Sequence, residues 1–275
     1  QRLIKSQPAF FATKGLKIDQ MEAISKDGTR VPYFMVSKED LALNGQNPTL
    51  LYGYGGFEIS MLSSYRATTG ISWLENGGVY VLANIRGGGE FGPRWHQAAL
   101  KENRQRAYDD FIAIAEHLIE RNVTTPGHLG IRGGSNGGLL MGNMIVQRPD
   151  LFKAVVCQVP LLDMKRFNKL LAGASWMGEY GNPDLPEEWA FLQKYSPYQL
   201  VKSAMKYPRV LFTTSTRDDR VHPGHARKMV AKMTDQGHDV LYYENMEGGH
   251  GGASDNPQRA FVEAMIHTFL WKELL

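Results

Sequence analysis

Residues 130–138 read Gly-Ile-Arg-Gly-Gly-Ser-Asn-Gly-Gly, and this stretch decides the fold. It contains the pattern Gly-x-Ser-x-Gly between a short apolar strand predicted at 129–132 and a helix predicted at 138–146. Glycines at Gly133 and Gly137 remove the Cβ atoms where the helix and the neighbouring strand approach each other. The context predicts a strained strand-to-helix turn that exposes Ser135 as a nucleophile. The alternative is a glycine-rich turn whose serine only caps the helix.

Around this stretch, apolar β-branched runs alternate with helical patterns. Runs at 18–24 and 31–36 flank a turn at 26–29 and predict an antiparallel hairpin. Further strands are predicted at 49–52, 79–85, 154–158, 209–214 and 240–243, and further helices at 106–121, 224–236 and 257–274. A hairpin followed by repeated strand–helix units predicts an α/β-hydrolase fold, with a mostly parallel central sheet and helices on both faces. We expect one catalytic domain over 1–275, with the Pro-, Trp- and Tyr-rich segment 160–201 as an insertion.

Composition excludes several other classes of protein. Charged residues are 21% of the chain and are mixed in sign along it, with a net charge of +3, so we expect neither a nucleic-acid partner nor a membrane-binding face. No apolar run approaches the roughly 18–20 residues of a membrane span. The single cysteine cannot form an internal disulfide. The chain begins without methionine, which favours a processed, cut or partial chain, and it has no signal sequence at its start. The compartment stays unknown from sequence, with a cytoplasmic location favoured.

A nucleophilic serine needs a base and an acid, which follow it along the chain in this fold. His250 comes directly after the last predicted strand and is surrounded by four glycines, which favours it as the base over a solvated loop histidine. The acid is expected after the strand 209–214, where Asp218 and Asp219 are adjacent and spacing alone cannot choose between them. The N–H of Asn136, at the start of the helix, is expected to stabilise an oxyanion.

Two other kinds of site are rejected. The pattern Gly-x-Gly-x-x-Gly at 87–92 follows a predicted strand, but the acidic residues about 20 positions later lie inside a predicted helix. A dinucleotide site is therefore not expected. With one cysteine and no His-Glu-x-x-His pattern, no metal site is expected either, and the predicted reaction needs no cofactor.

Several motifs together resemble the prolyl oligopeptidase family. The serine motif at 133–140 is similar to that of the family, as are the four stretches 52–57, 86–92, 218–221 and 249–251. The similarity extends from about Met21 onward. It implies that Asp218 is the triad acid and that the hydroxyl of Tyr54 joins the Asn136 N–H in the oxyanion hole.

The resemblance also implies a binding site for a proline side chain, to which the segment 160–201 contributes. Arg220 falls where an arginine holds a substrate carbonyl, and Trp176 where an indole stacks on the proline ring. The surrounding wall would come from Phe57, Leu161, Tyr180 and Val221. An aromatic pocket suits proline, which is a flat apolar ring in peptide linkage. From pattern alone, Trp176 and Tyr180 would instead be read as packing the insertion against the sheet.

These features predict a serine endopeptidase that cleaves short peptides after proline through an acyl-enzyme. The family also has a β-propeller that caps the site, and these residues contain none. We therefore expect another chain region to supply it, or an open site. The rival enzyme is a carboxylesterase, which would not need Trp176 and Arg220. A non-catalytic binding module is the other alternative, and it would not need the complete triad.

Overall fold

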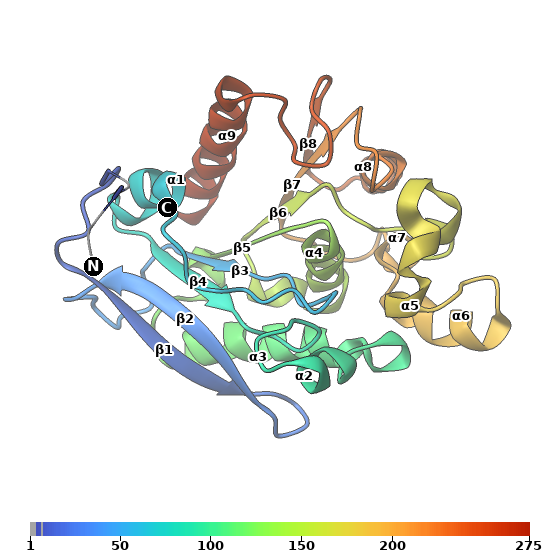
Figure 1. Cartoon of the computed structure of the whole chain (residues 1–275), viewed down its shortest axis with the longest axis horizontal. Coiled ribbons are helices and arrows are strands. Elements are labelled where there is room, and N and C mark those ends of the chain that lie inside the picture. Colours follow the sequence, from blue (N-terminus) through green and yellow to red (C-terminus); the bar gives the residue numbers. More distant parts are fainter. Residues whose placement is uncertain (1–3, 7) are drawn as a thin grey trace.

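The predicted hairpin forms one edge of a single sheet in the part of the chain that the structure describes, residues 4–6 and 8–275. In this computed structural model, eight strands pair in the order β1-β2-β4-β3-β5-β6-β7-β8 (Figure 1). The pairs β1–β2 and β2–β4 are antiparallel and the others are parallel. The strands are Leu16–Ile24 (β1), Arg30–Lys38 (β2), Thr49–Tyr52 (β3), Val79–Ala83 (β4), Leu129–Gly134 (β5), Ala154–Gln158 (β6), Arg209–Ser215 (β7) and Val240–Asn245 (β8).

Helices cover both faces of the sheet, as the sequence predicts. The helices are Ala67–Thr69 (α1), Pro93–Gln97 (α2), Gln105–Glu120 (α3), Asn136–Gln147 (α4), Met177–Tyr180 (α5), Pro186–Leu192 (α6), Pro197–Leu200 (α7), Gly224–Asp235 (α8) and Asn256–Leu274 (α9). Buried side chains of α3, α4 and α8 share one hydrophobic cluster, and those of α9 share another with a π-helical turn at Gly70–Leu74. Figure 1 shows α3 and α9 on opposite sides of the sheet.

Period-two alternation in the strands explains the two clusters. In β6, Val155 and Cys157 belong to the cluster under α3 and α4, whereas Ala154 and Val156 belong to the one under α9. Each side of a buried parallel strand therefore packs on helices, which is why these strands are apolar throughout. Gly130 of β5 lies directly beneath α9, where an added Cβ would come within 2.9 Å of Leu270.

The elements differ from the predicted ones at a few places. The helix after the serine begins at Asn136, two residues earlier than predicted, because the turn at Ser135 leads directly into it. Two short helices, α1 and α2, were not predicted, since fewer than two turns give little periodic signal. The segment 160–201 holds α5, α6 and α7 between β6 and β7, and the described residues contain no propeller.

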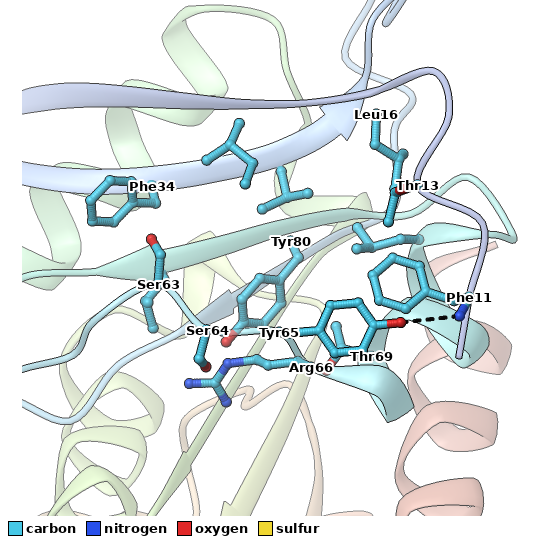
Figure 2. Close-up of a pocket in the computed structure, with 14 residues that line it drawn as sticks. Phe11, Thr13, Leu16, Phe34, Ser63, Ser64, Tyr65, Arg66, Thr69 and Tyr80 are labelled. Carbon is cyan, nitrogen blue, oxygen red and sulfur yellow. Dashed lines mark hydrogen bonds between the residues drawn. The ribbon is translucent and has the colours of Figure 1, made fainter. Parts of the chain in front are cut away.

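A cavity of about 400 Å³ lies at the hairpin end of the sheet (Figure 2). Its floor is the face of β1, β2 and β4 that carries Phe34 and Tyr80, and Phe11 stacks on Tyr65 at its rim with ring centroids 4.9 Å apart. The amides of Phe10 and Phe11 both donate to the Tyr65 hydroxyl, at 2.7 and 3.3 Å. None of the predicted site residues lines this cavity, so it is separate from the candidate site.

Candidate active site

The turn between β5 and α4 has the geometry of a nucleophile elbow. Ser135 lies at φ 59° and ψ −116°, a conformation that a residue with a side chain adopts only under strain. Its amide donates to the Gln158 carbonyl at 2.9 Å, which fixes the turn to β6. A Cβ added to Gly133 would meet the Gly137 carbonyl oxygen at 2.4 Å, and one added to Gly137 would meet the Gly53 oxygen at 2.7 Å. Both glycines are therefore required by the close approach of backbones, as the sequence predicts.

The predicted base and one of the two candidate acids lie together. His250 Nδ1 is 2.8 Å from Asp218 Oδ2. Asp218 is buried, and its other carboxylate oxygen accepts the amides of Arg220 and Val221, both at 2.9 Å. Asp219 is exposed and makes no hydrogen bond to His250 among the described residues. A carboxylate acceptor at Nδ1 makes that nitrogen the donor, which leaves Nε2 as the acceptor.

The three loops that carry these residues leave the same edge of the sheet. Parallel pairing brings the carboxyl ends of β5, β6, β7 and β8 side by side. A small cavity of about 60 Å³ is lined by His250, Val159 and Gln158, and the Gln158 carbonyl accepts the Ser135 amide. Within the described residues no hydrogen bond joins Ser135 to His250, and the Tyr54 hydroxyl lies near Ser135. Such contacts are often loose without substrate and tighten when it binds.

Tyr54 lies next to Asn136, the residue that follows the serine. Burial raises the pKa of Tyr54, opposed by the positive charges of Arg220 and Arg104, so the phenol keeps its proton and can donate. The Asn136 amide is among those that a helix leaves unpaired at its N-terminus. Its side-chain amide donates to the Tyr54 carbonyl at 2.6 Å. Two hydrogen-bond donors therefore flank Ser135, as an oxyanion hole requires.

The predicted substrate-binding residues belong to the hydrophobic core or pack against it. Leu161, Tyr180 and Val221 are buried, while Phe57 and Trp176 are half-buried and contact the same cluster. Phe57 and Tyr180 meet edge to face, with ring centroids 5.6 Å apart. The edge-to-face contact thus joins the loop after β3 to α5.

Arg220 differs from these residues because it is exposed. Its carbonyl accepts the Ala172 amide at 3.4 Å, which joins the loop 216–221 (the acid loop, which carries Asp218) to the segment 160–201. The side chain is therefore free to meet a ligand while its backbone is fixed.

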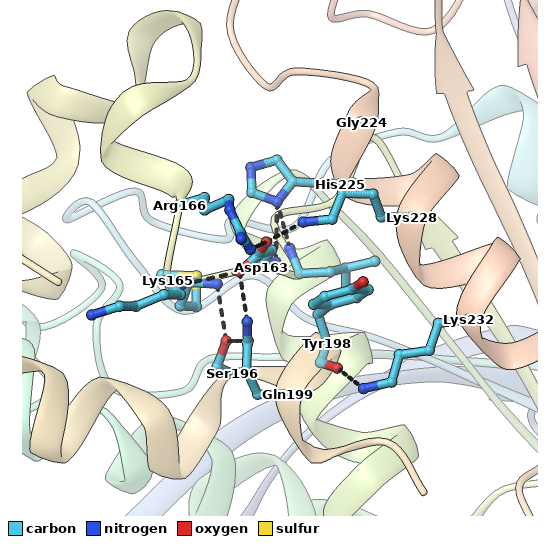
Figure 3. A network of polar contacts seen from close by, with 12 residues as sticks. Asp163, Lys165, Arg166, Ser196, Tyr198, Gln199, Gly224, His225, Lys228 and Lys232 are labelled. Carbon is cyan, nitrogen blue, oxygen red and sulfur yellow. Dashed lines mark hydrogen bonds and ion pairs between the residues drawn. The ribbon is translucent and has the colours of Figure 1, made fainter. Parts of the chain in front are cut away.

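A buried polar network attaches the segment 160–201 to α8 (Figure 3). The carboxylate of Asp163 accepts Gln199 at 2.8 Å and Arg166 at 3.3 Å, and it forms an ion pair with Lys228 of α8. His225 Nδ1 accepts the amides of Leu162 and Asp163, at 3.2 and 3.1 Å. The loop that carries Leu161 is therefore held against the helix that follows the acid loop.

A buried cluster of charged side chains beside Asn136 was not predicted from the sequence. Arg104 is 1% exposed and donates to Glu179 at 2.8 Å, and it also donates to the side-chain oxygen of Asn136. Glu179 further pairs with His96 Nε2 at 2.7 Å. No pattern in the sequence links residues 96, 104 and 179. The only available clue was that Glu179 directly precedes Tyr180 and lies three residues after Trp176.

The described residues contain no group of three or more His, Cys, Asp or Glu side chains that could hold a metal ion. None of the helices in the described part of the chain combines the length and apolar composition needed to cross a membrane.

The sheet order, the strained serine and the Asp218–His250 pair define a protein of the α/β-hydrolase class with a serine hydrolase type of site. A family model described as the prolyl oligopeptidase family matches residues 64–274. The chain belongs to the prolyl oligopeptidase family.

Named relatives agree with this assignment. The chain is 57% identical to an uncharacterized peptidase of Sinorhizobium fredii, over 99% of the chain and 38% of that protein. It is 39% identical to a prolyl endopeptidase of Elizabethkingia miricola, over 93% of the chain and 37% of that protein. A solved structure of a post-proline cleaving enzyme from Rickettsia typhi superposes with a TM-score of 0.91 at 41% identity, covering 100% of this chain and 40% of that one. The chain thus spans well under half the length of these relatives.

Proposed function

We propose that this chain carries the catalytic site of a serine endopeptidase that cleaves short peptides on the carboxyl side of proline. The observation that carries the proposal is the buried Asp218 carboxylate 2.8 Å from His250, on loops that leave the same sheet edge as the strained Ser135. A histidine oriented in this way has its Nε2 free to take a proton from a serine hydroxyl. A binding module would have no use for this arrangement.

In the proposed reaction, Ser135 Oγ attacks the carbonyl carbon of the scissile peptide bond and His250 takes the hydroxyl proton. Asp218 stabilises the imidazolium that forms. In this proposal the Tyr54 hydroxyl and the backbone N–H of Asn136 donate to the oxygen that becomes negative. The support is that the Asn136 side chain donates to the Tyr54 carbonyl, which holds the two residues next to each other. His250 then protonates the leaving amine as the C–N bond breaks, which leaves an ester on Ser135. Water attacks the carbonyl carbon of this ester while His250 takes one of the water protons, and His250 returns that proton to Ser135 Oγ as the ester bond breaks.

Proline specificity is proposed from the walls beside Ser135. In this proposal, 1–275 is one catalytic domain, and 160–201 is an insertion that supplies Leu161, Trp176 and Tyr180. Phe57 and Val221 complete the apolar wall, and Arg220 holds a substrate carbonyl. The support is the edge-to-face contact of Phe57 with Tyr180, the exposed position of Arg220, and the proline-directed names of several relatives.

A matched set of chromogenic substrates tests this function. The purified chain is assayed with an N-blocked Gly-Pro anilide, the corresponding Gly-Ala anilide and a short-chain acyl ester. We expect the Gly-Pro anilide to be cleaved faster than the Gly-Ala anilide. Ser135→Ala should lower kcat by about 10⁴-fold or more, because no other group supplies the nucleophile.

The control is Ser203→Ala, since Ser203 is exposed in the loop before β7. That variant should retain the activity of the unaltered chain. Ester cleavage alone, lost in Ser135→Ala, would support a serine hydrolase but contradict peptide specificity. Equal activity of both serine variants would contradict the assignment of the nucleophile.

A further inference from the structure

The loop that carries Tyr54 is held in a strained conformation. Phe57 and Glu58 both have left-handed backbone angles, at φ 57° and 56°, although neither is glycine. Such a conformation persists only where neighbouring groups hold it. The loop 54–58 must therefore be fixed by contacts outside itself.

Two side chains hold this loop from behind. At one end, the Asn136 side chain donates to the Tyr54 carbonyl at 2.6 Å. At the other end, the Phe57 amide donates to Glu179 Oε1 at 2.9 Å. The first of these contacts comes from the helix that follows Ser135, and the second comes from α5 in the segment 160–201.

The two contacts are parts of one buried network. The guanidinium of Arg104 donates both to Glu179 Oε1 and to the side-chain oxygen of Asn136, which also accepts the Tyr180 hydroxyl at 2.7 Å. Arg104 and Glu179 are 1% and 6% exposed, so their charges are compensated by each other rather than by water. His96 occupies the remaining carboxylate oxygen of Glu179.

We propose that Glu179 is a positioning residue, which holds the Phe57 amide and Arg104 so that the Tyr54 hydroxyl is fixed over the developing oxyanion. The inference rests on the proposed function, because it requires Ser135 and Tyr54 to act on a substrate. Trp176, Glu179 and Tyr180 belong to one short stretch. The stretch that is proposed to line the proline site therefore also supplies the carboxylate that holds the Tyr54 loop. Because the Tyr54 hydroxyl is proposed to act on the oxyanion of the transition state, loss of Glu179 should lower kcat with little change in KM.

A double-mutant cycle between Glu179→Gln and Tyr54→Phe tests this link. Glu179→Gln should lower kcat by about 10- to 100-fold, because a misplaced donor loses most of its effect. Tyr54→Phe should lower kcat by about 100-fold or more, through loss of one donor. If Glu179 acts through Tyr54, the double variant should be no slower than Tyr54→Phe alone.

The matched control is Glu273→Gln. Glu273 forms an ion pair with Arg209 at 2.8 Å, where β7 begins, at the edge of the sheet opposite the site. Its loss should leave kcat unchanged in both the unaltered and the Tyr54→Phe backgrounds. If the kcat losses of Glu179→Gln and Tyr54→Phe multiply in the double variant, the inference is overturned. It is also overturned if Glu179→Gln raises KM and leaves kcat unchanged.

A second variant and a second measurement distinguish a local effect of Glu179 from misfolding of the chain. Glu179→Asp keeps a negative charge beside Arg104 but withdraws the oxygen from the Phe57 amide, so its kcat should also fall. Hydrogen exchange of the peptide 53–59 should become faster in both Glu179 variants. Unchanged exchange there would overturn the inference even if the chain cleaved no substrate. Activity that survives Ser135→Ala would instead refute the proposed function.

Discussion

Asp218 and Asp219 are identical side chains one position apart, and only their surroundings distinguish them. Asp218 is 4% exposed, accepts two backbone amides and contacts His250, whereas Asp219 is in solvent. With one oxygen occupied by amides, the other oxygen of Asp218 is held in a fixed direction toward the imidazole. A residue held in this way can fix the tautomer of His250, and a solvated one cannot.

We therefore predict opposite results for the two matched variants. Asp218→Asn should lower kcat by about 10⁴-fold, because an amide cannot stabilise the imidazolium and favours the wrong tautomer. Asp219→Asn should change kcat by less than about twofold, as surface substitutions usually do. Steady-state kinetics on the same substrate, with thermal unfolding as a check on folding, compares the two. A similar loss in both variants would show that the acid is not confined to Asp218.

The sequence predicts some of these residues better than others, and the reason is physical. Ser135 and His250 lie in glycine-rich stretches whose backbone geometry is local, so their positions could be predicted from the motif and the chain order. The choice between Asp218 and Asp219 depends on which one the loop buries, and that is a tertiary property. Arg104 and Glu179 are 75 residues apart, and no local pattern brings them together.

At the scale of elements, the unit formed by β5, Ser135 and α4 depends on backbones in direct contact. Gly137 lies against the Gly53 carbonyl, and a Cβ there would meet a backbone oxygen at 2.7 Å. Gly137 lies in α4 and Gly53 directly follows β3, so the atoms in contact are backbone atoms that cannot move as a flexible side chain could. The first turn of α4 is thus fixed to the end of β3, which leads into the Tyr54 loop.

Gly137→Ala should destabilise the protein by about 1–3 kcal/mol, or more if the strands cannot adjust. Gly127→Ala is the matched control, since its added Cβ would have Thr125 Oγ1 as its nearest neighbour at 3.8 Å. The control should change the free energy of unfolding by less than about 0.5 kcal/mol. Urea unfolding of the two variants measures the difference. Equal stability would mean that the elbow tolerates a side chain at Gly137.

Elements with strong periodicity could be predicted, and those made by tertiary contacts could not. The hairpin was correctly predicted because its alternating strands flank an Asp-Gly turn, and the structure extends the pairing to Leu16 and Lys38. The strands 49–52 and 154–158 were predicted with their observed bounds, since each is a short apolar run. Short helices were expected within 160–201 and are present, but their bounds were not predicted, because they carry no such period and depend on anchors such as Asp163.

At the scale of the whole molecule, the segment 160–201 and α8 are joined through a histidine that must remain neutral. His225 is 1% exposed, and its Nδ1 accepts two backbone amides. A proton on that nitrogen would remove the acceptor for both amides and place a charge in the core. Burial lowers the pKa of His225 to about 4, with Lys228 and His222 adding to the effect and Asp163 opposing it.

This histidine should make the stability of the whole protein depend on pH. Between its ordinary pKa of 6.5 and the folded value of about 4, the unfolded chain binds a proton that the folded protein does not. The free energy of unfolding should therefore fall as the pH is lowered through this range, by about 3 kcal/mol from His225. Above pH 6.5 the contribution of His225 should be constant.

Urea unfolding between pH 7.5 and 4.5 measures this loss, and His225→Asn isolates it. The asparagine oxygen can take the place of Nδ1 as the acceptor for Leu162 and Asp163, but it does not titrate. Burial also lowers the pKa values of His117 and His267, so part of the pH dependence should remain in the variant. We expect the two stability curves to converge as the pH falls. Parallel curves would mean that His225 is protonated as readily in the folded protein as in the unfolded chain.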